Sequence, residues 1–334
     1  MRSRPFGTLP DGRSVEVCEI VGGGLTAQIL TYGATVQDLR LDGFGHPLVL
    51  GSETLSGYLD GMTFFGALVG RFANRIAGGR FVLDGTTHQV PRNWLDRHAL
   101  HGGPSGTGQS LWEVRRLLPD EVTLGLVLPD GDMGFPGRMQ VEATFALPGD
   151  AKLAISIRAR TDAATPCSFA HHGYFVFDDT GDITNHELCV GADRYLPVDE
   201  DLIPTGEIAP VVGTGLDFRK PCPVGRAAID HNFCLSARPL PLRPVAWLRS
   251  PASGLRLTVA TTEPGLQVYN GAYIPELGLS GLDGRRYGPF AGIALETQGW
   301  PDAPNVPHFP SAILRSEDTY RHDVTYRFDR DDAR

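Results

Sequence analysis

The chain has 334 residues, of which 41% are hydrophobic and 21% charged, so it can bury a sizeable core and is neither a disordered tail nor a fibre. Its 41 glycines and 26 prolines follow no strict period, which excludes collagen and indicates many turns. A formal net charge of −9, with no run of Lys or Arg, argues against nucleic acid as a partner.

The predicted elements are mostly strands. A stretch at 55–59 could form one or two helical turns, and no longer helical pattern follows. Asp84-Gly85 separates two short apolar and β-branched runs at 81–83 and 86–87, which predicts a hairpin, because a type I′ turn needs positive φ at both central residues.

Five further stretches alternate apolar and polar residues with period two, as half-buried strands do. They lie at 122–128, 139–147, 153–159, 255–259 and 320–328. Pro148-Gly149-Asp150 predicts the turn that joins the second and third stretches into a hairpin.

The pattern predicts an all-β fold, a large antiparallel β-sandwich with little helix. No linker, composition shift or repeat of 20–50 residues divides the chain, so we expect a single domain over residues 1–334.

The five cysteines are odd in number and form no CxxC pair, which favours neither a disulfide framework nor a zinc knuckle. The N-terminus lacks the apolar stretch of a secretion signal, and no segment approaches the ~18 apolar residues of a membrane helix. We therefore expect a cytoplasmic protein with no membrane contact.

Polar side chains stand in apolar or glycine-rich settings in five segments. Because an uncompensated buried polar group costs about 1–3 kcal/mol, such positions are candidates for function, although each alone could equally be structural. They are Asn74 and Arg75, His101, His171 and His172, Asp230 with its neighbours, and Glu296.

Taken in order, these segments resemble the aldose 1-epimerase (mutarotase) family over nearly the whole chain. The matching motifs are GRFANRI around Asn74, LHGG (100–103), HHGYFVF (171–177), ADRYLPVDEDLIPTGE (192–207), DHNF (230–233), QVYNG (267–271) and LETQGWPDAPN (295–305). This third motif departs from the family pattern, which usually has Asn where His171 precedes the catalytic histidine and Asn-Leu in place of Val176-Phe177.

The resemblance implies a supersandwich of β-strands with an open, polar sugar cleft. It also implies interconversion of the α and β anomers of free monosaccharides, with neither cofactor nor metal. By resemblance, Glu296 is the general base at the anomeric hydroxyl and His172 the general acid at the ring oxygen. The positions that would hold the sugar hydroxyls are Asn74, Arg75, His101, Asp230 and Gln267.

A carboxylate with a pKa near 4.3 and a histidine near 6.5 supply both proton-transfer forms close to pH 7. We therefore expect that neither Glu296 nor His172 needs an extreme environment. An aromatic side chain such as Trp300, Tyr174 or Phe135 could stack on the apolar face of the sugar.

Three other classes fit some of the same residues. A glycoside hydrolase could use Glu296 and Asp230 as its carboxylate pair. A metal enzyme could use His101, His172 and Glu296 as ligands. A non-catalytic carbohydrate-binding protein would need no proton transfer. The sequence leaves the physiological aldose open, as well as the choice between monomer and homodimer.

Overall fold

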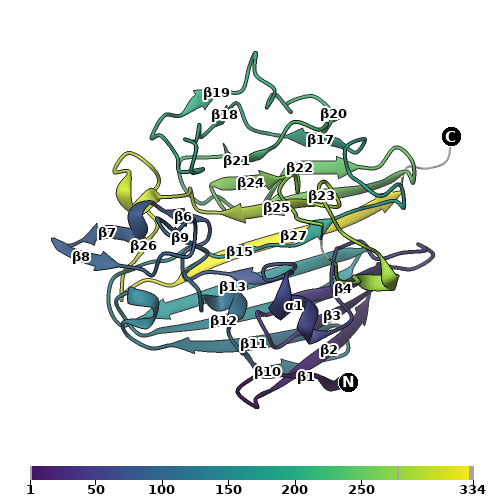
Figure 1. Ribbon diagram of the computed structural model, residues 1–334, viewed down its shortest axis with the longest axis horizontal. Coiled ribbons are helices and arrows are strands. Elements are labelled where there is room, and N and C mark those ends of the chain that lie inside the picture. Colours follow the sequence, from purple (N-terminus) through teal and green to yellow (C-terminus); the bar gives the residue numbers. More distant parts are fainter. Residues whose placement is uncertain (1, 277, 331–334) are drawn as a thin grey trace.

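A computed structural model describes residues 2–276 and 278–330, and its largest element is a nine-stranded antiparallel sheet (Figure 1). All five alternating stretches lie in this sheet, so these strand predictions are confirmed. In spatial order the strands are β10 (Glu113–Leu117), β11 (Glu121–Leu128), β12 (Met139–Gly149), β13 (Lys152–Thr161), β27 (Tyr320–Arg330), β23 (Leu255–Thr261), β22 (Arg243–Arg249), β17 (Glu187–Val190) and β20 (Cys222–Pro223).

The β12–β13 hairpin is confirmed, but its turn is not at 148–150 as predicted. Pro148 and Gly149 end β12, after a shift of register that follows Ala146. The turn residues are Asp150 and Ala151, with φ of 54° and 44°. Positive φ at two central residues matches the twist of paired strands, so this geometry outweighs the local preference of proline.

Two smaller sheets complete the sandwich. A four-stranded sheet, in purple in Figure 1, packs on β11 and β12 through β2. It comprises β1 (Arg2–Thr8), β2 (Ser14–Gly22), β3 (Leu25–Leu30) and β4 (Thr35–Leu41). A six-stranded sheet comprises β16 (Tyr174–Phe175), β25 (Ile293–Gln298), β24 (Gly265–Tyr269), β21 (Asp230–Cys234), β18 (Arg194–Tyr195) and β19 (Ala209–Pro210).

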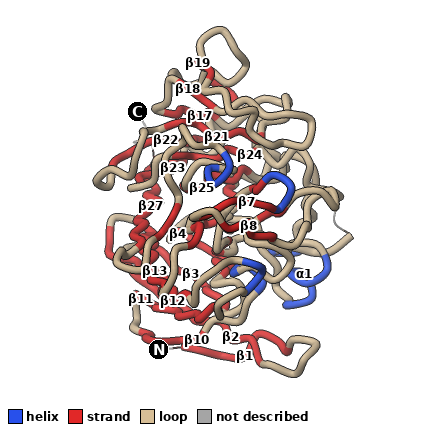
Figure 2. The backbone as a smooth tube through the Cα atoms, turned by 90° about the vertical axis from the view of Figure 1, so that its left-hand side faces the viewer, coloured by secondary structure: helices blue, strands red, loops and turns tan. Residues whose placement is uncertain are grey.

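The remaining elements are short. Figure 2 shows strands throughout the molecule and helix only in brief coils, so the all-β prediction is confirmed. The predicted helical turn is α1 (Leu55–Asp60), and the predicted hairpin is β7 (Arg80–Leu83) with β8 (Thr86–Gln89). The other pairs are β5 (Leu68–Val69) with β15 (Ala170–His171), β6 (Arg75–Ile76) with β9 (Ala99–Leu100), and β14 (Thr165–Pro166) with β26 (Ile313–Leu314). Single 3₁₀ turns lie at Ala77–Gly79, Thr107–Gln109, Asp132–Gly134, Leu282–Gly284 and Ala303–Asn305.

Strand β25 has no exposed side, since all six of its residues are buried. The Thr297 hydroxyl hydrogen-bonds to Nε2 of His322 on β27 at 2.8 Å, which ties one face of β25 to the nine-stranded sheet. Because side chains alternate along a strand, the neighbouring Glu296 points to the opposite face. That face carries the polar cleft described below.

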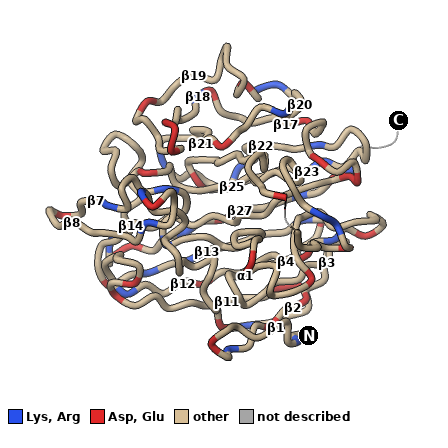
Figure 3. Tube along the Cα trace, viewed as in Figure 1, with Lys and Arg blue, Asp and Glu red and all other residues tan. Residues whose placement is uncertain are grey.

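Acidic and basic residues are interspersed along the chain rather than gathered on one element (Figure 3). Among the described residues, no helix has both the length and the apolar character needed to cross a membrane.

Candidate active site

A cleft of about 200 Å³ opens beside the face of β25 that carries Glu296 and contains six of the seven predicted site residues. The seventh, Gln267, lies behind it. Residues from β6, β9, β16, β21, β24, β25 and the loops between strands line the cleft: Phe64, Asn74, Arg75, Trp94, Leu100, His101, His172, Tyr174, Asp230, Tyr269, Tyr273 and Glu296.

Two buried polar residues of the cleft lie close together: Glu296 and His172, which are only 2% and 5% exposed. Oε1 of Glu296 lies 3.6 Å from Nε2 of His172. Oε2 of Glu296 and Nδ1 of His172 have no hydrogen-bond partner among the described residues. Buried polar atoms are normally paired, so these atoms are suited to a ligand that brings its own polar groups.

Burial shifts the pKa of both partners. It raises the pKa of Glu296 well above its usual value, and the nearby Asp230 carboxylate adds to the rise. It lowers the pKa of His172 to about 4. The expectation that neither residue needs an extreme environment is therefore wrong, because both are removed from water, which disfavours each charged form. With the pKa of Glu296 raised and that of His172 lowered, the pair holds one proton over the middle of the pH range.

His101 is held as a hydrogen-bond donor. Pairing of β6 with β9 brings it next to Asn74, whose backbone N–H donates to Nδ1 of His101 at 3.1 Å. Burial lowers the pKa of His101 well below its usual value, so the ring is neutral. A neutral ring that accepts at Nδ1 carries its proton at Nε2. His101 can therefore donate from Nε2 to a sugar oxygen.

Arg75 and Asp230 form an ion pair in the cleft wall, with Nη2 and Oδ2 3.1 Å apart. The other oxygen of Asp230 accepts a hydrogen bond of 2.6 Å from Nε2 of Gln267. Gln267 is 2% exposed and lies opposite Glu296 in the β24–β25 register. It thus orients Asp230 from behind the cleft.

The two adjacent histidines of HHGYFVF point in opposite directions, as expected for a strand. His172 faces the cleft, whereas Nδ1 of His171 lies 3.3 Å from the hydroxyl of Tyr326 on β27. The departure at His171 therefore lies in the sandwich interior, outside the lining of the cleft.

Of the three aromatic candidates, only Tyr174 lines the cleft. Trp300 and Phe135 belong to a separate small core, and Nε1 of Trp300 donates to the Pro264 carbonyl. Sequence reasoning did not single out five lining residues: Phe64, Trp94, Leu100, Tyr269 and Tyr273. Tyr269 could have been found, because it lies two residues after Gln267 on one strand; the loop residues carry no such local signal.

His101, His172 and Glu296 also meet the distance requirement of a metal site, since one ligand atom of each lies within 4.8 Å of the others. However, Nδ1 of His101 accepts the Asn74 N–H. Coordination through Nε2 would need the ring proton at Nδ1, where it would oppose that N–H. The arrangement suits a hydrogen-bonded ligand better than a metal ion.

Gly102 keeps the loop after His101 in place, and Gly102→Ala should destabilise the fold. Gly102 has φ of +84°, and a Cβ there would lie 2.0 Å from the Gly70 carbonyl oxygen. We expect a loss of at least about 2 kcal/mol in the free energy of unfolding, measured by urea denaturation. Gly103→Ala is the matched control: its φ is +96°, but the nearest atom lies at 3.4 Å, so it should cost about 1 kcal/mol. Equal losses of unfolding free energy in the two variants would contradict the role of the close approach between residue 102 and the Gly70 carbonyl oxygen.

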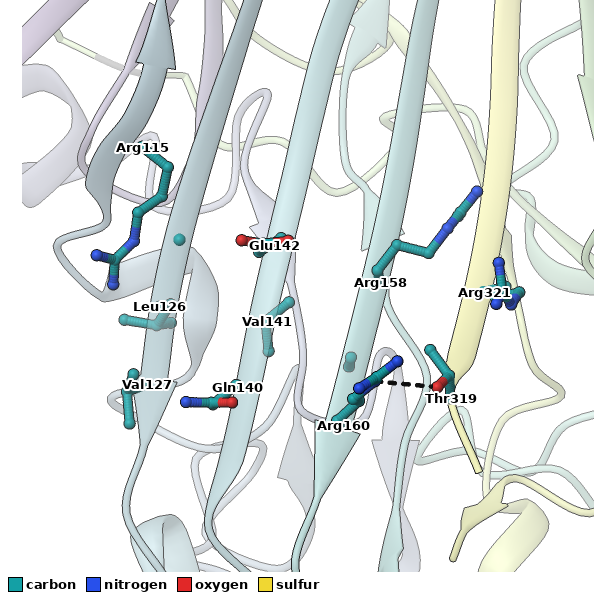
Figure 4. Close-up of a pocket in the computed structure, with 12 residues that line it drawn as sticks. Arg115, Leu126, Val127, Gln140, Val141, Glu142, Arg158, Arg160, Thr319 and Arg321 are labelled. Atoms are coloured by element: carbon teal, nitrogen blue, oxygen red, sulfur yellow. Dashed lines mark hydrogen bonds between the residues drawn. The ribbon is translucent and has the colours of Figure 1, made fainter. Parts of the chain in front are cut away.

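A second, larger hollow of about 690 Å³ lies over β10–β13 and β27 (Figure 4). Four arginines reach it, and two are paired: Arg158 with Asp323 and Arg115 with Glu113. None of the predicted site residues lines this hollow. It is an open, charged sheet face, and the cleft at Glu296 is the candidate active site.

Comparison with known proteins agrees with this geometry. The sequence model of the aldose 1-epimerase family matches residues 16–327. Galactose mutarotase of Rattus norvegicus is 40% identical over 336 residues, which cover 97% of each chain. Human galactose mutarotase is 39% identical over the same length, and aldose 1-epimerase of Escherichia coli K12 is 33% identical over 96% of each chain.

Solved structures show the same fold. The GalM/aldose epimerase homologue from C. elegans superposes with a TM-score of 0.89 at 30% identity, covering 95% of this chain and 99% of the other. Galactose 1-epimerase from Lactobacillus acidophilus superposes with a TM-score of 0.84 at 27% identity, covering 99% of both chains. With a family match over nearly its full length and relatives at 33–40% identity, this chain belongs to the aldose 1-epimerase family.

Proposed function

We propose that this protein interconverts the α and β anomers of free aldoses through the buried pair of Glu296 and His172. The observation that carries the proposal is the position of this pair, with its side chains 3.6 Å apart at the base of the cleft. The surrounding donors and acceptors fit a polyhydroxylated ring. Names of the relatives, galactose mutarotase and aldose 1-epimerase, support the same reaction.

The pair matches the proton balance of the reaction. Ring opening removes the proton from the anomeric hydroxyl and places a proton on the ring oxygen as the C1–O5 bond breaks. The C1 carbonyl then rotates about C1–C2, and closure on the other face reverses both transfers. No proton is gained or lost overall, so a pair that holds one proton is sufficient.

We assign the two roles to the two residues as follows. Glu296, in its ionised form, takes the proton from O1, while His172 delivers the shared proton to O5. Burial favours neutral forms of both groups, and transfer within the pair generates the reactive form without changing the charge of the pair. Positioned proton transfers of this kind accelerate reactions by about 10²–10⁴-fold each.

The cleft favours a neutral sugar. Among the described lining residues Arg75 is the one cation, and its partner Asp230 compensates its charge. A phosphorylated sugar would need additional cationic donors. Asn74, Arg75, His101 and Asp230 would hold the hydroxyls, with Gln267 supporting Asp230. We further propose a single-domain, cytoplasmic enzyme that acts as a monomer or homodimer and uses no cofactor.

The test is proton NMR of the anomeric signals of freshly dissolved α-glucose and α-galactose, with and without the protein, in the presence of a chelator. Accelerated equilibration to an unchanged final ratio supports the proposal. Sugar binding without acceleration would refute the enzymatic function, and release of sugar from an aryl glycoside would indicate a hydrolase instead.

Arg75→Ala should weaken sugar binding more than it slows the reaction. The guanidinium is 6% exposed and can donate charge-assisted hydrogen bonds, which contribute about 1.5–3 kcal/mol each. We expect KM to rise about 10–100-fold with kcat lowered less, as measured by initial rates of mutarotation. Arg80→Ala, at an exposed position of β7, is the control and should leave both constants unchanged. A fall in kcat at constant KM would place Arg75 in the transition state instead.

A further inference from the structure

The longest of the family-like motifs, residues 192–207, has no part in the proposed proton transfer, and its position suggests another role. Its first half forms β18, where Tyr195 pairs with Phe233 on β21, the strand that carries Asp230. Its second half reaches the loop 93–98, which carries Trp94. Residues 192–207 therefore contact both β21, which carries Asp230, and the loop that carries Trp94.

Trp94 covers the guanidinium of Arg75. The Cζ atom of Arg75 lies 4.5 Å from the centre of the Trp94 ring, a distance typical of a cation–π contact. Nη2 of Arg75 is bound to Asp230 and Nη1 donates to Oδ1 of Asn74 at 3.4 Å, whereas Nε has no hydrogen-bond partner among the described residues. The stacked Trp94 ring thus restrains the plane of the Arg75 guanidinium, whose other contacts are made by its terminal nitrogens.

Asp201 in turn holds the Trp94 loop. Its backbone carbonyl accepts a hydrogen bond of 3.0 Å from Nε1 of Trp94. Its carboxylate contacts Nη2 of Arg97 at 2.6 Å and Nε2 of His98 at 3.1 Å. Because Nδ1 of His98 accepts the backbone N–H of Gly78, its Nε2 carries the proton that Asp201 accepts.

Asp201 is itself held by a tight turn. The Asp199 carboxylate accepts the backbone N–H groups of both Asp201 and Ile203, each at 2.9 Å. The backbone N–H of Asp199 also donates to the Ile203 carbonyl at 2.9 Å. This network makes residues 199–203 a rigid support on which the Trp94 loop rests.

We propose that Trp94 and Asp201 are positioning residues that orient Arg75 toward the sugar. In this role, residues 192–207 link the stacked Trp94–Arg75 pair to β21. One ring face of Trp94 covers the Arg75 guanidinium and is therefore closed to the sugar; in the proposed role Trp94 acts through Arg75. The inference rests on the proposed function, because it takes Arg75 to be a sugar-binding residue.

The test compares four variants by kcat and KM for anomer exchange, by calorimetric Kd for the sugar, and by thermal midpoint. Trp94→Leu should raise KM and Kd about tenfold, with kcat within about threefold of wild type. Trp94→Phe keeps an aromatic face and should restore both constants to within about threefold. Asp201→Asn should raise KM severalfold. Glu200→Gln, at the exposed residue next to Asp201, should match wild type.

Unchanged KM and Kd in both Trp94→Leu and Asp201→Asn would overturn the inference. So would equal loss in Trp94→Phe and Trp94→Leu, since an aromatic face over Arg75 would then not account for the effect. If Trp94→Leu does not fold, the KM and Kd of Trp94→Phe and Asp201→Asn test the inference. Wild-type protein that binds sugar without exchanging anomers would refute the proposed function, while the Kd series would still test Trp94.

Discussion

Glu296→Gln should lower kcat for anomer exchange by about 10³-fold or more and leave the sugar Kd within about threefold of wild type. Glutamine keeps the size of the side chain and one acceptor oxygen, but it cannot take the proton from O1. Because Glu296 is the proposed base for opening and the proposed acid for closure of the same bond, both half-reactions lose a positioned transfer, worth about 10²–10⁴-fold each. NMR exchange spectroscopy gives the rate, and calorimetry gives the Kd.

Glu263→Gln is the matched control for this prediction. Glu263 is equally buried, at 2% exposure, and burial raises its pKa to about 8, but it faces the Tyr320 hydroxyl outside the cleft. Its replacement should leave kcat within about twofold. A wild-type rate in Glu296→Gln would remove Glu296 as the base, whereas equal losses in both variants would indicate a general effect of altering a buried carboxyl group.

Much of the fold was predictable because most long strands have one buried and one exposed face. Strands β11, β12, β13, β23 and β27 all show the period-two pattern that this environment requires. Strand β25 is different, since it is covered on both faces and its six residues are all buried. An alternating pattern cannot reveal such a strand, and its packing against β27 depends on tertiary contacts.

The site, like the fold, contains residues that the sequence could predict and residues that it could not. Residues in distinctive motifs, such as Asn74 and His172, were predictable by resemblance, and the structure brings them into one cleft. Trp94 and Tyr273 were missed because loops from different segments bring them to the cleft. The pKa values were also misjudged, since the shifts at Glu296 and His172 come from burial by chain segments far apart in sequence.

His172→Asn should lower kcat by about 10²–10³-fold and change the shape of the pH profile. In the wild type, exchange should be fastest while the pair holds one proton. It should fall below about pH 4, where His172 takes up a second proton and the base is lost, and fall again at high pH as the raised pKa of Glu296 is passed. Without His172, only Glu296 titrates. The residual rate should therefore rise with pH as this carboxyl ionises, so the bell-shaped profile becomes a single ascending curve.

His171→Asn is the control that separates proton transfer from loss of a buried ring. His171 is adjacent and equally buried, and burial lowers its pKa to about 3, but it faces Tyr326 rather than the cleft. Asparagine is the residue that the family motif usually has there, so the variant should fold and keep the bell-shaped profile. If His172→Asn also keeps its acid limb near pH 4, that limb does not belong to His172. The group that protonates O5 would then have to be sought elsewhere in the cleft, where Tyr174, Tyr269 and Tyr273 carry hydroxyls among the described lining residues.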